Sequence, residues 1–415
     1  MNAVKKLHES AVAAAGPLNM AAWAVLIYVL SNSGGFMYFN YYIYLAESML
    51  QGKLYVLNPP TWLTEFTWHA GKPYLFYGPL PAILLLPVVA LFQLFRPPAH
   101  EFLNLSYVSI VVGAIDVALV WIMLERLGAA RKVVFWITLV FAFGSVHYWV
   151  SEYGNNWLFS QVVAEFFLLL GAIEALGKRR GVLVGLAVGA AVLSRNACLL
   201  TVPFYLVALN LPKPALKRSA WFLAGLAFMA AFNGWYNWAR FGNPLDNGYV
   251  AGEAALLRPA HGSFSLHYLV KMLPAYVWRG PTFQLTPPFV TVTDHGLSLF
   301  WTTPPFLYLI PAMVAFFKKR PPAWKFGLPA WSASDWWLAA AAWSAVLPIA
   351  FLYLCYNGDG WRQFGSRYTL DYAIFILVIL GLYFKDNLPK AFIWLAGAAF
   401  AINVWGVVWW RVFKW

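Results

Sequence analysis

The chain has 415 residues, of which 61% are hydrophobic and 11% charged, and its formal net charge is +13. A soluble domain of ordinary composition carries about 25% charged residues, so the composition excludes that class. Mean hydropathy is +0.63, and apolar runs of about 20 residues recur along the chain, which is typical of an all-helical polytopic membrane protein.

The apolar runs predict about eleven transmembrane helices within a single transmembrane domain, 1–415. They lie near 17–36, 103–124, 132–150, 157–177, 181–194, 197–211, 219–238, 298–317, 336–356, 369–385 and 390–410. The first is interpreted as a retained helix rather than a signal peptide. A further run, 79–96, could cross the membrane or lie along its surface.

Basic residues decide the topology. With a cytoplasmic N-terminus and a surface helix at 79–96, every short cytoplasmic connection is rich in Lys and Arg. These connections contain Arg126, Arg131 and Lys132; Lys178, Arg179 and Arg180; Lys213, Lys217 and Arg218; Lys318, Lys319, Arg320 and Lys325; and Lys385 and Lys390. The positive charge is therefore interpreted as a topology signal in the inner (cytoplasmic) membrane, and no nucleic-acid partner is expected. The long polar segments 37–102, 239–297 and 357–368 then face outward, which favours an extracytoplasmic function.

Two sets of residues, three glycines and two cysteines, are interpreted as structural rather than catalytic. Gly181, Gly185 and Gly189 are spaced for close packing of one helix on another. Cys198 and Cys355 lie in or beside apolar runs, match no metal spacing and indicate no disulfide framework.

Two carboxylates stand out in the first outer segment. Glu47 lies in an amphipathic stretch, and Glu65 lies in an extended stretch with His69 and Lys72 close by. A partly desolvated carboxylate can act as a general base, because burial raises its pKa toward the working pH. The alternative is a solvated acid or a local ion pair with Lys53 or Lys72.

Three arginines form a second candidate group. Arg195 lies at the outward turn between 181–194 and 197–211, and Arg362 and Arg367 precede the span 369–385. The planar guanidinium suits phosphate, so these residues are candidates for binding an anionic ligand. The alternatives are contact with lipid headgroups or pairing with Asp359 and Asp371.

Asp116 and Glu165 fall well inside predicted spans, where ionisable residues are functional candidates by default. They could serve a proton or ion path, or bond neighbouring polar side chains. The residues His147, Glu152, Asn155 and Asn156 cluster at an outward helix end and could line the same cavity. His261, His267 and His295 are too scattered to predict a metal site.

The order of six motifs resembles the GT-C superfamily of integral-membrane glycosyltransferases, which includes protein O-mannosyltransferases and aminoarabinose transferases. Within it the chain resembles bacterial phospholipid-carrier-dependent glycosyltransferases. The motifs are NYYIYLAESMLQGKLY, EFTWHAGKPYLFYGPLPAILLLP, GLAVGAAVLSRNACLLTVP, YNWARFGNPLDNGY, HGLSLFWTTPPFLYLIP and WRQFGSRYTLDY. Together they span nearly the whole chain.

The resemblance implies a GT-C-like fold with surface helices in the first outer loop, and a polyprenyl-phosphate sugar as donor. It implies inverting transfer to a lipid, glycan or protein acceptor, a loop acid as base and basic residues at the donor phosphate. Many relatives carry an Asp where this chain has Asn40, ahead of Tyr44. An amide cannot act as the base, so Glu65 is preferred and Glu47 is the second choice.

The remaining expectations follow from that assignment. Arg195, Arg367 and Arg362 bind the donor phosphate, and Asn40, Tyr44, His69, Lys72 and Asn156 line the substrate cavity. No cofactor is expected, and a divalent metal is left open. The alternatives are a non-catalytic GT-C-like subunit of a membrane assembly, or a lipid or ion transporter that uses Asp116 and Glu165.

Overall fold

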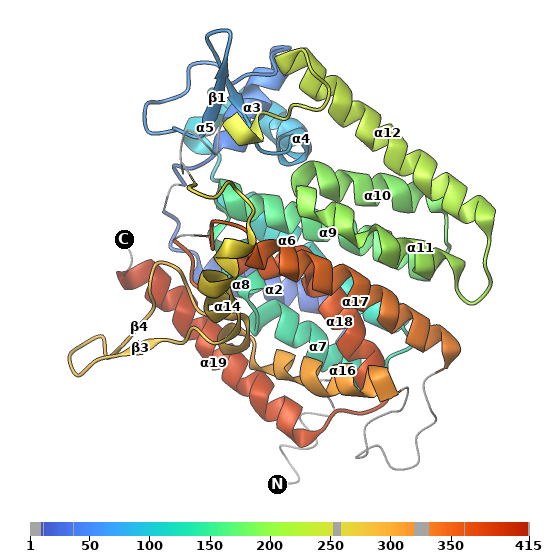
Figure 1. Ribbon diagram of the computed structural model, residues 1–415. Helices are drawn as coiled ribbons and strands as arrows, with labels where there is room; N and C mark the ends of the chain where they lie inside the picture. Colours follow the sequence, from blue (N-terminus) through green and yellow to red (C-terminus); the bar gives the residue numbers. More distant parts are fainter. Residues whose placement is uncertain are drawn as a thin grey trace.

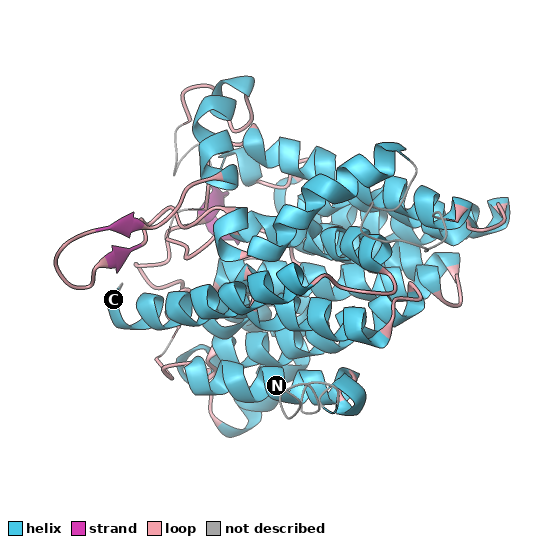
Figure 2. Ribbon diagram, turned by 90° about the horizontal axis from the view of Figure 1, so that it is seen from below, coloured by secondary structure: helices cyan, strands magenta, loops and turns pink. Residues whose placement is uncertain are grey.

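The computed structural model describes residues 10, 12–35, 37–251, 259–318, 332–360 and 362–413. Lys319, Arg320 and Lys325, which the sequence analysis assigned to a cytoplasmic connection, lie outside these ranges. Within them the fold is almost entirely helical, and the short strands gather at one end of the molecule (Figures 1 and 2).

The long helices coincide with the predicted apolar runs. They are α2 (Pro17–Ser31), α6 (Leu105–Arg126), α9 (Asn156–Leu176), α10 (Gly181–Ser194), α11 (Val202–Asn210), α12 (Leu216–Phe241), α17 (Ala333–Leu354), α18 (Leu370–Phe384) and α19 (Lys390–Phe413). Short 3-10 turns, η1 (Asn196–Thr201) and η4 (Arg367–Thr369), precede α11 and α18.

Two predicted spans are interrupted. The run 132–150 forms α7 (Arg131–Phe143) and α8 (Val146–Tyr153), which meet at an angle of 50°. The run 298–317 forms α15 (Leu299–Thr302), η3 (Pro304–Tyr308) and α16 (Leu309–Lys318). Pro304 and Pro305 lack backbone N–H groups, so a continuous α-helix through them would lose hydrogen bonds.

Five helices of the described residues are long and apolar enough to cross a membrane, or six if α7 and α8 form one bent span. Five shorter apolar segments accompany them, namely Pro17–Ser31, Leu80–Phe95, Gly181–Ser194, Asn196–Asn210 and Pro304–Lys318. The chain is therefore a multi-pass helical membrane protein, and the count of eleven crossings stays a prediction.

The segment 37–102, which is predicted to face outward and is called the outer segment below, folds into short elements at one end of the bundle. It contains α3 (Tyr41–Leu50), the hairpin of β1 (Phe66–His69) and β2 (Lys72–Leu75), α4 (Leu80–Phe95) and α5 (Ala99–Phe102). The hairpin is antiparallel, with Phe66 opposite Leu75. Figure 1 views α4 nearly along its axis, whereas α10, α11 and α17 lie across the view. A helix along the membrane surface would have this orientation relative to spanning helices.

The second large segment also lies at this end. It contains η2 (Leu266–Tyr268), α14 (Leu269–Val277) and a hairpin of β3 (Thr282–Phe283) with β4 (Val290–Thr291). The β3–β4 hairpin and the C-terminal end of α19 project on the same side in Figure 1, whereas the connection from α11 to α12 lies on the opposite side.

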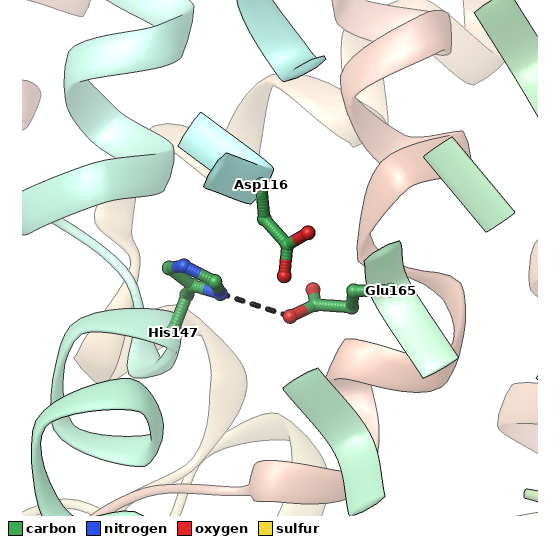
Figure 3. A group of neighbouring side chains, drawn as sticks. All are labelled: Asp116, His147 and Glu165. Carbon is green, nitrogen blue, oxygen red and sulfur yellow. Dashed lines mark hydrogen bonds and ion pairs between the residues drawn. The ribbon is translucent and has the colours of Figure 1, made fainter. Parts of the chain in front are cut away.

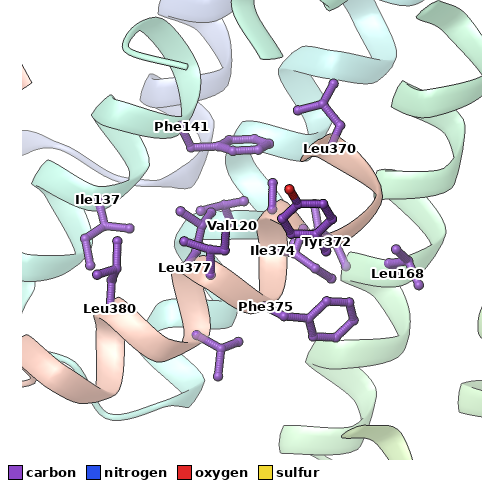
Figure 4. Packing of buried hydrophobic residues seen from close by; sticks show 14 of the residues in the cluster. Val120, Ile137, Phe141, Leu168, Leu370, Tyr372, Ile374, Phe375, Leu377 and Leu380 are labelled. Carbon is purple, nitrogen blue, oxygen red and sulfur yellow. The ribbon is translucent and has the colours of Figure 1, made fainter. Parts of the chain in front are cut away.

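Helix α18 forms the centre of the core. Every residue from Leu370 to Phe384 is buried, as expected for a helix that is apolar on all faces. Figure 4 shows Ile374, Phe375 and Leu377 of α18 among side chains of α6, α7 and α9. A second apolar cluster joins α3 and α4 to α9 and α10, so the outer segment is packed directly onto the bundle.

The glycine ridge of α10 packs against α12, as predicted. A Cβ on Gly181 would lie 2.2 Å from the carbonyl oxygen of Arg218, and one on Gly185 would lie 2.1 Å from that of Phe222. Only glycine permits this backbone approach, so these residues serve helix packing.

Candidate active site

Glu65 lies at the start of the β1–β2 hairpin. Both its carboxylate and its backbone N–H form hydrogen bonds to other elements. Its Oε2 accepts a hydrogen bond from Tyr77 Oη, which follows β2, at 2.8 Å. The same oxygen accepts from Trp157 Nε1 at the start of α9, also at 2.8 Å. The backbone N–H groups of Thr64 and Glu65 donate to Tyr41 Oη of α3, each at 3.3 Å. Glu65 is therefore held where the outer segment meets the bundle.

The surroundings of Glu65 shift its proton affinity. Burial raises its pKa above the usual 4.5, while the hydrogen bonds from Tyr77 and Trp157 and the positive charge of Arg367 oppose that rise. Burial and the adjacent carboxylate raise the pKa of Tyr77 well above 10, so its hydroxyl keeps the proton that it donates. The result is a half-buried carboxylate with a pKa above that of an ordinary glutamate.

Arg195 ends α10 and is paired inside the bundle. Its Nε donates to both oxygens of Asp371 at 3.2 Å, and its Nη2 donates to Asp371 Oδ2 at 3.0 Å and to Tyr353 Oη at 3.1 Å. Tyr353 also donates to Asp371. Asp371 therefore neutralises Arg195, which is the alternative to anion binding that the sequence left open for this arginine.

Arg367 begins η4, next to Arg195 in space. The guanidinium carbons of both arginines lie 5.3 Å from the ring centre of Tyr368. Arg367 has no ion pair among the described residues, and its buried Nε has no hydrogen-bond partner there. Its charge acts on Glu65 instead.

Contacts between the outer segment and the bundle bring Glu65 and the two arginines to one end of the molecule. Burial raises the pKa of Tyr42; the positive charge of Arg195 opposes that rise, and the carboxylate of Glu65 adds to it. Gln161 of α9 donates to the carbonyl oxygen of Arg367 at 3.0 Å. Three of the predicted site residues, Glu65, Arg195 and Arg367, thus lie near one another.

Glu47 has different surroundings. Its Oε2 lies 2.6 Å from His100 Nδ1, and its Oε1 accepts from the backbone N–H of His100 at 3.2 Å. The ring of Tyr44 stacks on His100 with centroids 4.2 Å apart, and Asn40 Nδ2 donates to the carbonyl oxygen of His100 at 3.2 Å. Glu47, Asn40 and Tyr44 therefore fasten α3 to α5, and Glu65 is the acid that faces the arginines.

The other predicted cavity residues do not join this group. His69 is exposed and contacts Tyr74 and Phe241, and Lys72 lies 5.0 Å from the ring centre of Tyr55. Arg362 is exposed, and its charge acts on Tyr153.

Asn156 is fully buried, and neither atom of its side-chain amide has a partner among the described residues. It neighbours Trp157 in sequence, and its backbone N–H donates to Phe39 of the outer segment at 3.0 Å.

Sequence reasoning missed Tyr77, Trp157 and Tyr368. The chain has 22 Tyr and 23 Trp, so no single aromatic residue stood out. Their roles depend on contacts between distant segments, such as that of Trp157 with Glu65, and no local pattern encodes these.

A cavity of about 430 Å³ lies between the second large segment and the connection that follows α17. His261, His267 and Asn357 are among its lining residues, and the rings of the two histidines are 3.9 Å apart. Tyr356, which precedes Asn357, contacts Tyr368 with ring centres 6.0 Å apart. The third histidine is separate, because His295 pairs with Asp359 at 2.8 Å.

No protein-family model matches the chain, and no curated protein matches it in sequence. Its fold is similar to that of the Archaeoglobus fulgidus oligosaccharyltransferase in the apo form, with a TM-score of 0.52 at 13% identity. The match covers 94% of this chain and 56% of that one. This chain therefore shares the fold of that part of the oligosaccharyltransferase. The same oligosaccharyltransferase in complex with an inhibitory peptide and a dolichol-phosphate matches with a TM-score of 0.48.

This likeness of fold agrees with the resemblance to GT-C glycosyltransferases inferred from the six motifs. The chain spans about half the length of the solved oligosaccharyltransferase, 56%, so the likeness concerns that part of its architecture.

Proposed function

We propose that this chain transfers a sugar from a polyprenyl-phosphate donor to an acceptor on the extracytoplasmic face of the membrane. The observation that carries the proposal is the grouping of Glu65 with Arg367, neither of which forms an ion pair with another side chain in the described part of the chain. The likeness of fold supports the reaction class, and the solved relative is itself a glycosyltransferase.

In the proposed reaction Arg367 acts on the donor phosphate and Glu65 acts on the acceptor. Arg367 attracts the donor phosphate. Arg195, whose charge is paired with Asp371, presents its guanidinium to the same ring of Tyr368 and is the second candidate contact for the phosphate. The acceptor oxygen attacks the anomeric carbon, and the bond from that carbon to the phosphate oxygen breaks. The phosphate leaves with the electron pair, and Arg367 stabilises the charge that develops on it.

Glu65 takes the proton that the acceptor loses. Its raised pKa suits a general base, because a carboxylate of ordinary acidity would bind the proton too weakly. Attack opposite the departing phosphate inverts the configuration at the anomeric carbon. Near Arg367 the described residues offer a divalent ion one carboxylate without a cationic partner, whereas such ions prefer several oxygens. These residues therefore do not fit a divalent ion at Arg367.

The test is transfer from radiolabelled polyprenyl-phosphate sugars in proteoliposomes. Glu65→Gln keeps an oxygen that can accept from Tyr77 and Trp157 but cannot take a proton, so we expect transfer to fall by about 100-fold or more. Glu47→Gln is the matched control, and it should retain most of the activity. Full transfer by Glu65→Gln would exclude the proposed base.

The same assay addresses the alternative of a non-catalytic subunit. If the wild-type chain transfers no sugar from any donor tested, alone or with its membrane partners, the enzyme proposal fails. Asn40, which replaces the acid of many relatives, is then explained by loss of catalysis.

A further inference from the structure

Three ionisable side chains meet inside the helix bundle, away from the candidate active site. They are Asp116 of α6, His147 of α8 and Glu165 of α9, and all three are fully buried. One ligand atom from each lies within 4.8 Å of the other two. Figure 3 shows the three side chains pointing toward one another from three different helices.

The hydrogen bonds of His147 fix its tautomer. Its Nε2 lies 3.1 Å from the carbonyl oxygen of Gly113 and 3.2 Å from Ser151 Oγ. A carbonyl oxygen can only accept, so Nε2 carries a hydrogen and donates it to Gly113. A neutral ring then presents the lone pair of Nδ1 to Glu165 Oε2, 2.8 Å away. Two acceptors at this distance require a proton or a metal ion that both can bind.

The carboxylates lack the partners that buried acids need. Neither oxygen of Asp116 has a hydrogen-bond partner among the described residues, and the same holds for Oε1 of Glu165. A proton on Glu165 or His147 would satisfy their shared contact but would leave both oxygens of Asp116 unpaired. Burial of an unpaired carboxylate is strongly unfavourable, so a group that binds all three residues at once explains the arrangement better.

The charges around the trio point to a cation. Two carboxylates and a neutral imidazole carry two negative charges, and among the described residues no Lys or Arg pairs with Asp116 or Glu165. The other charge that acts on Glu165 is the carboxylate of Asp371, which is itself neutralised by Arg195. Tyr28 lies nearby, but its hydroxyl donates to the carbonyl oxygen of Ala142.

We propose that Asp116, His147 and Glu165 bind one divalent transition-metal ion through a carboxylate oxygen of each acid and Nδ1 of the histidine. A nitrogen with two carboxylate oxygens suits ions such as Zn²⁺ or Mn²⁺, whereas Mg²⁺ and Ca²⁺ prefer oxygen alone. Ligands about 2.1 Å from one ion lie roughly 3.4 Å apart. The ligand atoms lie within 4.8 Å of one another, so the most distant pair would approach by up to about 1.4 Å, and Nδ1 and Oε2, 2.8 Å apart, would separate slightly. The bond of Nε2–H to Gly113 orients the ring as in known metal-binding histidines.

Such an ion would tie three helices together. Glu165 lies eight residues below Trp157 on α9, which is about 12 Å along the helix axis. The ion therefore cannot touch a sugar at Glu65, and its role is to fix α9 against α6 and α8. Gly113 permits this packing, because a Cβ there would lie 2.3 Å from Ser151 Oγ. The inference stands independently of the proposed sugar transfer.

The test is metal binding by the purified full chain. After treatment with a chelator, the protein is reloaded with Zn²⁺ or Mn²⁺ separately, and bound metal is counted by mass spectrometry. We expect one equivalent in wild type and at least a tenfold loss of affinity in Asp116→Asn, in line with loss of one ligand. Glu152→Gln is the matched control, because Glu152 is an equally buried acid of α8 that pairs with Arg411 instead. It should bind metal as wild type does.

Two further readouts keep the outcome decisive. Co²⁺ bound to wild type should give a visible absorption spectrum of nitrogen and oxygen ligands, which requires no variant to fold. Metal should raise the thermal unfolding temperature of wild type and of Glu152→Gln but not that of Asp116→Asn or Glu165→Gln. Absence of stoichiometric metal in wild type, or equal binding by Asp116→Asn, overturns the proposal.

Discussion

The proton affinity of Glu65 is set by burial, which raises its pKa, and by donors that stabilise the charged form. Catalysis by the base needs the ionised carboxylate, so transfer should decline as pH falls through the raised pKa, at higher pH than the usual 4.5 would give. Tyr77→Phe removes one donor to that carboxylate. The pKa then rises further, and the acid limb of kcat/KM against pH should move upward by up to about one unit.

Tyr55→Phe is the matched control for this profile, because Tyr55 lies on the same outer segment and contacts Tyr74 and Lys72 instead. Its acid limb should coincide with that of wild type. A downward shift for Tyr77→Phe would contradict the assignment of Glu65 as the titrating base.

The two arginines should respond differently to removal. Arg367 has no carboxylate partner, so Arg367→Ala should lose about 1 kcal/mol or less of stability from its contact with Tyr368. Transfer should nevertheless fall by about 100-fold, because phosphate charge is no longer stabilised. Arg195→Ala strands the buried Asp371 and should destabilise the fold by about 3–5 kcal/mol. Thermal unfolding and donor transfer, measured on both variants, separate the two effects.

A double change completes this comparison. Arg195→Ala with Asp371→Asn removes both charges of the pair, and stability should recover relative to Arg195→Ala while transfer stays low. Recovery of transfer together with stability would mean that Arg195 acts only through folding.

Candidate functional acids could be predicted from the sequence because charged residues are rare in this chain. With 16 Asp and Glu in 415 residues, each acid outside a basic connection was conspicuous, and Glu65, Asp116 and Glu165 were singled out. Which charges meet was predictable only as one alternative among several. Pairing of an arginine with Asp371 and a cavity shared by His147 and Asp116 were both left open. That Asp371 pairs with Arg195, 176 positions away, and that His147 meets Asp116 through the packing of α6 on α8, is encoded by no spacing in the sequence.

At the scale of elements, apolar periodicity located the helices well because lipid and core both require long apolar stretches. The helix predicted over 181–194 is found as Gly181–Ser194. The run 132–150 was predicted to be continuous, yet it bends by 50° after Phe143, where Gly144 ends α7 and the Ser145 hydroxyl caps α8. A hydropathy pattern contains no signal for such a cap. The sequence therefore did not predict the break between α7 and α8, which directs His147 toward the interior of the bundle.

The contact of the outer segment with α10 depends on one glycine. A Cβ on Gly78 would lie 1.9 Å from the carbonyl oxygen of Leu193, two residues before Arg195. Gly78→Ala should therefore push the segment that contains Tyr77 away from α10. We expect a loss of about 1–3 kcal/mol in stability, typical of overpacking, and a larger relative loss of transfer because Glu65 and the arginines separate.

Gly397→Ala is the control for Gly78→Ala, because a Cβ at Gly397 of α19 would meet no atom within 4 Å. It should leave unfolding temperature and transfer unchanged. Wild-type transfer by Gly78→Ala would show that the outer segment need not approach α10 so closely.

At the scale of the whole molecule, the long segments and strands lie at one end and basic residues gather at the other. The strands, the outer segment and the C-terminal end of α19 lie at one end, and the basic connection between α11 and α12 lies at the other (Figure 1). The order of spans in the sequence predicts this division, since each crossing alternates the side. Which end faces the cytoplasm follows from the bias of Lys and Arg alone.

Cysteine labelling in intact cells tests that orientation. Both native cysteines, Cys198 and Cys355, are buried and should not react with a membrane-impermeant maleimide. Leu285 is 99% exposed in the β3–β4 hairpin, and Lys213 is exposed in the basic connection between α11 and α12. Because basic connections stay on the cytoplasmic side, Leu285→Cys should label in intact cells and Lys213→Cys only after permeabilisation. The opposite pattern would place Glu65 and the arginines at the cytoplasmic face, where a donor presented on the outer leaflet could not reach them.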